Sequence, residues 1–139
     1  MINVLVVDDE PSMLEAVMNM LGSQGFAVTS CANGSHAVEL IERDNFDVVL
    51  ADVVMEGLVG TALLDAIHDR RPDVPVIFMS SMPQRRVRQA VPGDYEFIRK
   101  PLEPNALADL IDRVVRTSNL HLLAGREAAE MATGRSRLG

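Results

Sequence analysis

VLVVDDE, at residues 4–10, is an apolar run that ends directly on acidic residues. Three further apolar runs also end on a polar residue: VVLA (48–51) on Asp52, VIFM (76–79) on Ser80, and FIR (97–99) on Lys100. Apolar runs of this length indicate strands that are buried on both faces, as in a parallel sheet covered by helices. The four runs therefore predict an α/β fold with a parallel sheet at its centre.

The residues that close these runs are expected to lie close together. The carboxyl ends of parallel strands meet at one edge of the sheet, and ligands of open α/β sheets bind beyond that edge. Asp8, Asp9, Asp52, Ser80 and Lys100 would there supply three carboxylates, one hydroxyl and one ammonium. This set is typical of a site for a divalent cation and a phosphoryl group.

Each of these residues has an ordinary explanation when it is taken alone. Asp9 and Glu10 precede a helix, where acidic residues cap the first turn and favour its dipole. Asp52 fits a loop, Ser80 fits a turn, and Lys100 fits a solvated surface. Only their joint position at the strand ends favours a functional site.

The composition fits one globular domain. The chain has 139 residues, of which 47% are hydrophobic and 24% charged, and its net charge is −7 at pH 7. This acidic balance argues against direct binding of nucleic acid, because phosphates need a basic surface. The single cysteine, Cys31, excludes an internal disulfide and a multi-cysteine zinc site, and fits a half-buried strand residue in a reducing compartment. We see no membrane-spanning run and no signal peptide, so a cytoplasmic protein without a membrane contact is expected.

Strand and helix patterns alternate along the chain. Strands are predicted at residues 2–7, 26–31, 46–51, 74–79 and 95–99. The helices after them are predicted to turn inward Leu14, Val17, Met18 and Leu21; Ala37, Leu40 and Ile41; Leu63, Leu64 and Ile67; and Leu107, Leu110, Ile111 and Val114. Asn33 or Ser35 is expected to cap the second helix, and Pro104 to open the last. The alternation indicates a doubly wound sheet with helices on both faces.

Two segments depart from this regular pattern. Residues 82–94 are rich in arginine, lie between prolines, and predict at most a short or irregular fourth helix of about two turns. Their arginines fit either a docking patch or a solvated segment. Residues 1–118 form the predicted domain, and residues 119–139 are expected to be a tail that is partly helical or disordered. A helical tail would dock on the domain or on a second copy.

The motifs VLVVDDE, VVLADVVMEGLVG, VIFMSS and YEFIRKP, taken together, resemble the receiver domain of two-component response regulators. They occur in the order of that family and near its spacing, and the resemblance covers residues 2 to about 117. It implies a flavodoxin-like parallel sheet of five strands in the order 2-1-3-4-5. It also implies a protein that is switched by phosphorylation.

The resemblance gives each residue at the strand ends a role. Asp52 would accept a phosphoryl group, and Ser80 and Lys100 would contact its oxygens. The ligands of Mg²⁺ would be Asp8, Asp9, Asp52 and the backbone carbonyl of Val54. A cis bond before Pro101 would direct Lys100 toward the site, and Ser80 and Phe97 would form the switch.

Elementary chemistry agrees with these roles. Clustered carboxylates repel one another, so that a cation is needed to keep them ionised together. Mg²⁺ prefers hard oxygen ligands and pairs with phosphate. Asp52 would then be a carboxylate nucleophile that forms an acyl phosphate, and Lys100 would supply the second positive charge.

One position in the loop after Asp52 departs from what the family usually carries. Glu56 stands in place of a proline, so the loop after Asp52 is expected to be less rigid.

The residues two positions after Asp52 and Ser80 help to position the hydrolytic water in this family. Here these residues are Val54 and Met82, and neither can orient water. We therefore predict slow autodephosphorylation.

The leading hypothesis is a receiver that signals through protein contacts and is not a turnover enzyme. It would take its phosphoryl group from a sensor histidine kinase or a phosphotransfer protein and act on a downstream protein effector, with a homodimer left open. A first alternative is the receiver fragment of a larger regulator with a DNA-binding output domain. A second is a phosphohydrolase, which usually carries another acid where Val54 stands. A third is a ligand-gated pseudo-receiver, which normally lacks an acidic or lysine position that is present here.

Overall fold

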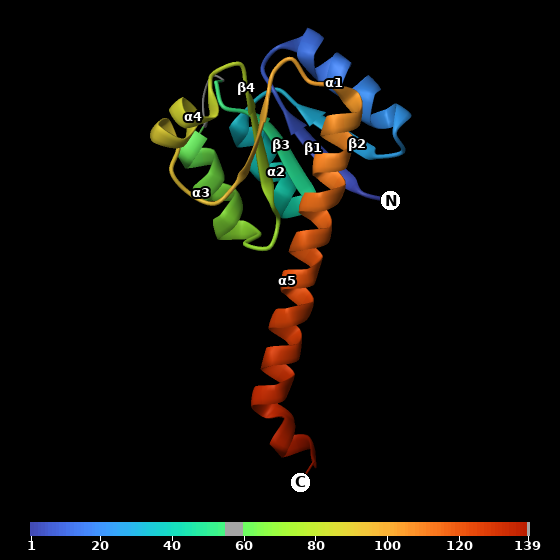
Figure 1. The fold of residues 1–139 in the computed structure, drawn as a ribbon, viewed down its shortest axis with the longest axis vertical. Helices are drawn as coiled ribbons and strands as arrows, with labels where there is room; N and C mark the ends of the chain where they lie inside the picture. Colours follow the sequence, from blue (N-terminus) through green and yellow to red (C-terminus); the bar gives the residue numbers. More distant parts are fainter. Residues whose placement is uncertain (55–59, 139) are drawn as a thin grey trace.

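The computed structural model describes the backbone of residues 1–54 and 60–138, and the side chains of residues 1–54 and 60–124. Five strands alternate with five helices in this part of the chain (Figure 1). The strands are β1 (Asn3–Val7), β2 (Ala27–Cys31), β3 (Val48–Asp52), β4 (Val76–Ser80) and β5 (Glu96–Arg99). The helices are α1 (Pro11–Ser23), α2 (Gly34–Arg43), α3 (Gly60–Arg70), α4 (Gln84–Ala90) and α5 (Pro104–Leu138). Glu56, on which the expected loosening of the loop after Asp52 depends, lies outside the described residues.

All five strands belong to one parallel sheet. Their order is β2-β1-β3-β4-β5. The chain therefore adds β2 on one side of β1 and the later strands on the other side, beginning with β3. The three central strands are almost completely buried, as their uninterrupted apolar runs predicted. The predicted doubly wound sheet, its strand order and its short fourth helix are thereby confirmed.

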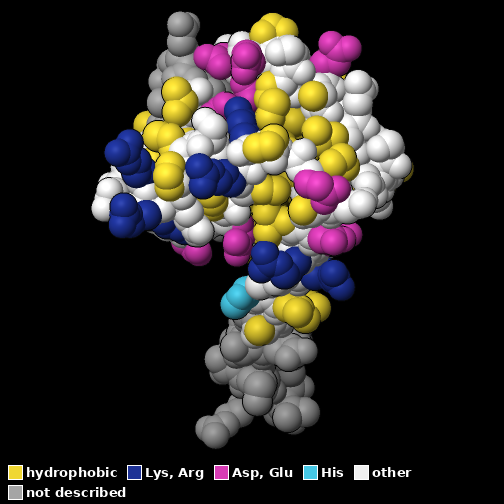
Figure 2. All heavy atoms as spheres, turned by 45° about the horizontal axis from the view of Figure 1, so that its top comes forward, with side chains coloured by type: hydrophobic (Ala, Val, Ile, Leu, Met, Phe, Trp, Pro, Cys, Tyr) yellow, Lys and Arg dark blue, Asp and Glu magenta, His cyan; other side chains and the backbone are white. Residues whose placement is uncertain are grey.

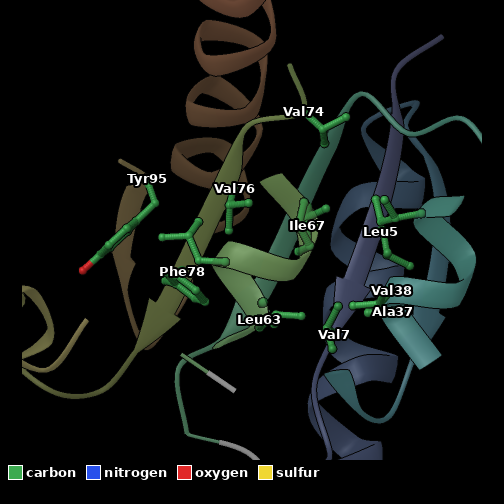
Figure 3. Packing of buried hydrophobic residues seen from close by; sticks show 14 of the residues in the cluster. Leu5, Val7, Ala37, Val38, Leu63, Ile67, Val74, Val76, Phe78 and Tyr95 are labelled. Carbon is green, nitrogen blue, oxygen red and sulfur yellow. The ribbon is translucent and has the colours of Figure 1, made fainter. Parts of the chain in front are cut away.

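Helices cover both faces of the sheet and form two apolar layers. One layer packs α2, α3 and α4 against the sheet and includes Phe78 and Tyr95 (Figure 3). The other layer packs α1 and α5 against the opposite face (Figure 1). Burial of these layers is the main favourable term for the fold, and it fixes the strand ends relative to one another.

The helix starts and inward faces follow the sequence closely, with one error. The side chain of Asn33 caps α2 by accepting a hydrogen bond from the backbone N–H of His36 at 2.8 Å. Met18 was wrongly predicted to face inward, since it is 37% exposed. The buried stripe of α1 is centred on Val17 and Leu21, so that Met18 falls at its solvent edge.

The fourth strand starts two residues later than predicted, at Val76. The backbone N–H of Val74 donates to the carbonyl of Arg71 at 3.1 Å, and this bond keeps Val74 in the turn that precedes the strand. Pro75 has no N–H to offer to a sheet. A run of apolar side chains in the sequence does not reveal that its first residues belong to a turn and not to the strand.

Helix α5 runs through the position where the domain was expected to end. It spans 35 residues, from Pro104 to Leu138, which corresponds to roughly 52 Å of helix. Its first half packs on the sheet, and its second half extends away from the body (Figure 1). Leu120, Leu122 and Leu123 are exposed where the helix leaves the body. Within the described residues, no helix is both long enough and apolar enough to cross a membrane.

Cys31 is buried more deeply than predicted, and its thiol should be unreactive. The residue is 4% exposed, and this burial raises the pKa of the thiol to about 11, partly offset by a hydrogen bond with the backbone of Asn33. We expect alkylation at pH 8 to be roughly 100-fold slower in the native protein than in urea, because thiolate is the reactive form. Stability should also fall as pH rises from about 9 to about 11, since only the unfolded thiol ionises there. Equal alkylation rates in native and denatured protein would contradict this expectation.

Candidate functional site

The residues singled out at the strand ends lie at one edge of the sheet. Asp8 follows β1, Asp52 ends β3, Ser80 ends β4, and Lys100 follows β5. Since the strands are parallel and in register, their carboxyl ends share this edge. Figure 2 shows acidic side chains gathered beside a basic one at this end of the molecule.

Lys100 joins two of the carboxylates. Its Nζ donates a hydrogen bond to Asp52 Oδ2 at 2.6 Å and lies 3.6 Å from Asp8 Oδ2. Asp8 is fully buried and Asp52 is 7% exposed, so that both carboxylates lie largely outside bulk water. A fixed ammonium in such surroundings interacts more strongly with a carboxylate than it does in water.

The backbone around Lys100 holds this ammonium in place. The N–H of Lys100 donates to the carbonyl of Ser80 at 2.9 Å, which extends the pairing of β4 and β5 by one residue. The peptide bond between Lys100 and Pro101 is cis. Burial by itself would lower the pKa of Lys100, but the hydrogen bond and charge of Asp52, aided by Asp8, raise it overall. Lys100 is therefore charged at neutral pH.

Asp8 carries an oxygen atom that lacks a hydrogen-bond donor. Asp8 Oδ1 accepts a hydrogen bond from the backbone N–H of Glu10 at 2.9 Å. Asp8 Oδ2 is buried and has no hydrogen-bond partner among the described residues, although the charge of Lys100 lies nearby. Burial raises the pKa of Asp8, the hydrogen bond from Glu10 opposes this rise, and the neighbouring charge of Asp52 adds to it. A carboxylate in this position would gain from a further cation.

Two short turns fix the other polar groups. The backbone N–H of Val54 donates to Asp52 Oδ1 at 2.8 Å, and that of Met82 donates to Ser80 Oγ at 3.0 Å. Each side chain thus bonds the backbone two residues further along, which is a common arrangement for Asp and Ser in turns. The Ser80 hydroxyl accepts in this bond, so its own hydrogen remains available to a partner.

The other two residues assigned to the metal lie nearer to solvent. Asp9 is exposed, and Val54, whose backbone carbonyl is the expected ligand, is 64% exposed as a residue. Among residues 1–54 and 60–124, the structure holds no group of three His, Cys, Asp or Glu side chains arranged to hold a metal ion. Lys100 supplies one positive charge beside the two buried carboxylates. The donor-poor Oδ2 of Asp8 and the hard oxygens of Asp52 nevertheless fit a divalent cation.

Phe97 lies on β5 opposite Phe78 of β4. It is only partly buried and packs against the layer that holds α2, α3 and α4. The ring is therefore not fully buried in this structure, and an inward turn of the switch would bury it further.

Replacing Asp8 with asparagine should stabilise the protein when Mg²⁺ is absent. Because burial raises the pKa of Asp8 above 3.8, the charged carboxylate is less favourable in the folded than in the unfolded state. This cost is absent at low pH and grows as pH rises past 3.8, so the gain should appear at neutral pH. We expect a gain on the order of 1 kcal/mol in the free energy of unfolding, measured by urea titration in EDTA.

Asp69, an exposed carboxylate on α3, provides the matched control. Asp69→Asn should leave the free energy of unfolding unchanged. Addition of Mg²⁺ should stabilise the wild type and the Asp69 variant but not Asp8→Asn. A variant at Asp8 that is less stable than the wild type at neutral pH in EDTA would count against this reading of the buried carboxylate.

One group of contacts between α4 and the chain that leads into β5 was not predicted. Tyr95, directly before β5, contacts the end of α4 through its hydroxyl, and Arg88 of α4 lies over its ring. The sequence offered only an arginine-rich segment and a tyrosine seven residues after Arg88. Their contact depends on where α4 lies, and no spacing within the sequence determines that.

A family model described as the response regulator receiver domain matches residues 4–112. The chain belongs to the response regulator receiver family. Receivers of this family are signalling modules of two-component systems, generally bind Mg²⁺ at the phosphorylation site, and interact with histidine kinases and output domains. Family membership confirms the prediction from the sequence motifs that this chain is a receiver of a two-component system.

Known relatives extend well beyond the region that they share with this receiver. The chain is 35% identical to the transcriptional activator protein PfeR of Pseudomonas aeruginosa, over 88% of this chain and 42% of PfeR. It is 31% identical to the DNA-binding transcriptional regulator NtrC of Escherichia coli, over 81% of this chain and 24% of NtrC. The receiver thus spans less than half the length of these relatives.

Solved structures include both short and long chains with this fold. The chemotaxis protein CheY4 of Vibrio cholerae is 27% identical, with a TM-score of 0.73, and the match covers 82% of this chain and 98% of CheY4. NtrX of Brucella abortus is 29% identical, with a TM-score of 0.80, and the match covers 94% of this chain and 30% of NtrX. The same receiver fold therefore occurs alone and as one part of a larger protein.

Proposed function

We propose that this receiver is activated when Asp52 accepts a phosphoryl group, and that it then signals through protein contacts. The observation that carries the proposal is the position of the Lys100 ammonium, 2.6 Å from Asp52 and 3.6 Å from the buried Asp8. A carboxylate nucleophile, a fixed cation and a hydroxyl on the neighbouring strand are the groups that phosphoryl transfer needs. Family membership supports the same reading.

The transfer step uses the groups that the fold brings together. An oxygen of Asp52 attacks phosphorus while the P–N bond of a phosphohistidine breaks, and the electron pair of that bond stays on the imidazole nitrogen. Lys100 neutralises charge on the equatorial phosphoryl oxygens, and the Ser80 hydroxyl donates to one of them. Mg²⁺, when held by Asp8, Asp9, Asp52 and the Val54 carbonyl, would supply the remaining positive charge.

The proposed partners follow from this chemistry. A sensor histidine kinase or a phosphotransfer protein donates the phosphoryl group, and a protein effector reads the result. The protein itself is not a turnover enzyme, because the acyl phosphate on Asp52 is its product and its signal. We retain the cytoplasm as the expected compartment and a homodimer as one form of the active state.

A second candidate rests on the length of the relatives. PfeR is named a transcriptional activator, and the present chain matches only 42% of it. The receiver would then control a DNA-binding output domain in the same polypeptide. Both candidates use the same phosphorylation site and differ only in what reads it.

The direct test of the proposed function is phosphorylation by a small donor. The full chain is incubated with acetyl phosphate and Mg²⁺, and its intact mass is measured. We expect the mass of one phosphoryl group to be added with Mg²⁺ and not with EDTA. An unchanged mass with Mg²⁺, from protein with native circular dichroism, would overturn the proposal.

The phosphorylated protein is expected to lose its phosphoryl group slowly. Val54, two residues after Asp52, is 64% exposed, and Met82 lies two residues after Ser80, so neither of these two positions carries a side chain that can orient water. We expect a lifetime of minutes or longer in Mg²⁺ without a kinase. Val54→Asn adds an amide that can orient water and should shorten the lifetime by roughly tenfold, a small part of what positioned groups can contribute.

The measurement is the decay of the phosphorylated mass after the donor is removed. Val54→Leu is the matched control, because it changes the size of the exposed side chain without adding a polar group. A lifetime of seconds in the wild type would show that another group positions the water.

A further inference from the structure

Helix α4 is short and has few attachments along its length. It has seven residues, Gln84 to Ala90, and Val87 is its only buried side chain. Its first turn has no side-chain cap. A helix this short is not stable by itself in water, so contacts at its two ends must determine where it lies.

The start of α4 is linked to the switch serine. Ser80 Oγ accepts a hydrogen bond from the backbone N–H of Met82 at 3.0 Å, two residues before the helix begins. If Ser80 turns toward a phosphoryl group on Asp52, its oxygen leaves Met82. The chain that leads into α4 then loses this attachment. The contacts at the far end of the helix then determine where α4 lies.

The far end of α4 is held by Tyr95. The Tyr95 hydroxyl donates to the carbonyl of Val91 at 2.5 Å and lies 3.4 Å from the carbonyl of Val87. Tyr95 is 6% exposed and Val91 is 4% exposed, so this bond is shielded from water. The hydroxyl therefore satisfies the Val91 carbonyl, which the end of a helix would otherwise leave without a donor, whereas the Val87 carbonyl already accepts from the backbone N–H of Val91.

Arg88 closes this attachment from the solvent side. Its guanidinium carbon lies 4.4 Å from the centre of the Tyr95 ring, and its Nη2 donates to the Tyr95 carbonyl at 3.2 Å. The ring also meets Phe78, whose ring centre is 4.9 Å away at an interplanar angle of 81°. Figure 3 shows Tyr95 beside Phe78, with its hydroxyl directed away from β4.

The turn between α4 and β5 leaves little freedom for another arrangement. Gly93 has a φ of +131°, and a Cβ atom there would lie 2.8 Å from Leu64 Cδ2. At the start of α3, a Cβ atom on Gly60 would lie 3.2 Å from Val91 Cγ2. The segment that carries Val91 is thus tightly packed, and it would have to move as a unit.

The same tyrosine adjoins the aromatic residue of the expected switch. Tyr95 and Phe97 are two residues apart and pack in the same apolar layer, and Phe97 pairs with Phe78 across the sheet. Since Phe78 touches the Tyr95 ring, an inward turn of Phe97 changes the surroundings of that ring. Protein interiors are close-packed, so that Tyr95 cannot stay in place when its neighbour enters the layer.

We propose that Tyr95 and Arg88 form a clasp that holds the end of α4 against β5 in the unphosphorylated receiver, and that phosphorylation opens it. The clasp consists of the hydroxyl bond to Val91 and the guanidinium over the ring. The proposal rests on the proposed function, because Asp52 must be phosphorylated for Ser80 and Phe97 to move. Contacts made in only one of two states stabilise that state, so weakening the clasp favours the phosphorylated conformation.

The chain offers a built-in reporter for this clasp. Tyr95 is its only tyrosine, and it has no tryptophan, so tyrosine fluorescence reports on this one side chain. A phenol that donates to a carbonyl is quenched, and release from that bond raises its emission. We expect emission to rise when the full chain is phosphorylated with acetyl phosphate and Mg²⁺. Hydrogen exchange of the amides of residues 86–91 should become at least about fivefold faster, the change expected from losing one hydrogen bond.

Intact mass measured on the same sample separates the two proposals. Protein that carries the phosphoryl group while its tyrosine emission and its exchange at residues 86–91 stay unchanged would overturn the clasp and leave the proposed function standing. Protein that gains no phosphoryl group would overturn the proposed function, and the opening of the clasp by phosphorylation with it.

Substitutions test the clasp without relying on fluorescence. Tyr95→Phe removes only the hydroxyl and should speed exchange at residues 86–91 by about fivefold in the unphosphorylated protein. It should also make phosphorylation by acetyl phosphate severalfold faster, which a purely structural role for Tyr95 would not do. Arg88→Met should act in the same direction. Arg85→Met, at an exposed position of the same helix, should match the wild type, and equal effects from Arg85 and Arg88 would contradict the proposal.

Discussion

Phosphoryl incorporation from acetyl phosphate is expected to fall below detection in Asp52→Asn. The amide that replaces the carboxylate keeps the shape of the side chain, but it is not a nucleophile toward phosphorus. It also removes the charge that accepts the hydrogen bond from Lys100 at 2.6 Å. Of the two carboxylates that the described part of the chain places beside Lys100, Asp8 is the more distant, since its Oδ2 lies 3.6 Å away and is fully buried.

The control for this prediction is Asp69→Asn, which removes an exposed carboxylate from α3. It should accept one phosphoryl group at the rate of the wild type. Intact mass is the measurement for both variants, and circular dichroism shows whether each is folded. Stoichiometric phosphorylation of folded Asp52→Asn would mean that a different residue is the acceptor.

Replacing Lys100 with methionine should slow phosphorylation by about 100-fold or more, the effect typical of removing a fixed group that stabilises developing charge. Methionine keeps much of the length of the side chain, so that loss of the ammonium is the main change. Its loss also leaves Asp52 and the buried Asp8 without the cation that now lies between them. We therefore expect Lys100→Met to be less stable than the wild type in EDTA and to recover part of that stability in Mg²⁺.

The initial rate of phosphorylation at saturating Mg²⁺ is the quantity to compare. Arg99→Met removes the neighbouring positive charge, which is exposed, and should change this rate by less than about twofold. Equal losses of rate at the two positions would show that general electrostatic attraction of the donor, rather than the place of Lys100, governs the reaction.

Most of the sheet and the convergence of its strand ends could be predicted from the sequence. Apolar runs such as VLVV and VVLA are informative because a strand buried on both faces leaves no room for polar residues. Their order in the chain then places Asp52 and Lys100 at one edge. Apolar patterning alone does not indicate which carboxylate accepts the phosphoryl group. The resemblance of the motifs to the receiver family predicts that it is Asp52.

The finer arrangement of the site could not be predicted in the same way. Asp8 and Asp9 are adjacent in the sequence, yet the first is fully buried and the second is exposed. In an extended chain, neighbouring side chains point in opposite directions, so only one of the two is buried. Which one it is depends on the register of β1 between β2 and β3. The clasp of Tyr95 on α4 likewise depends on the path of a loop.

The length of α5 shows a second limit of prediction from apolar patterns. Apolar periodicity fades after Ser118 because no sheet lies beneath the later residues, but the backbone remains helical to Leu138. Alanine, leucine, glutamate, methionine and arginine all favour helix without packing, so propensity carries the helix further than burial does. A pattern that detects buried faces does not detect such a segment.

The central claim is that the side chain of residue 52 carries the phosphoryl group. The most direct measurement is to phosphorylate the full chain with acetyl phosphate and Mg²⁺, reduce it with borohydride, and sequence its peptides by mass spectrometry. Borohydride converts an aspartyl phosphate to homoserine and leaves free aspartate unchanged. We expect homoserine at position 52 alone. Homoserine at another position, or none at all in protein that has gained the mass of a phosphoryl group, would contradict the claim.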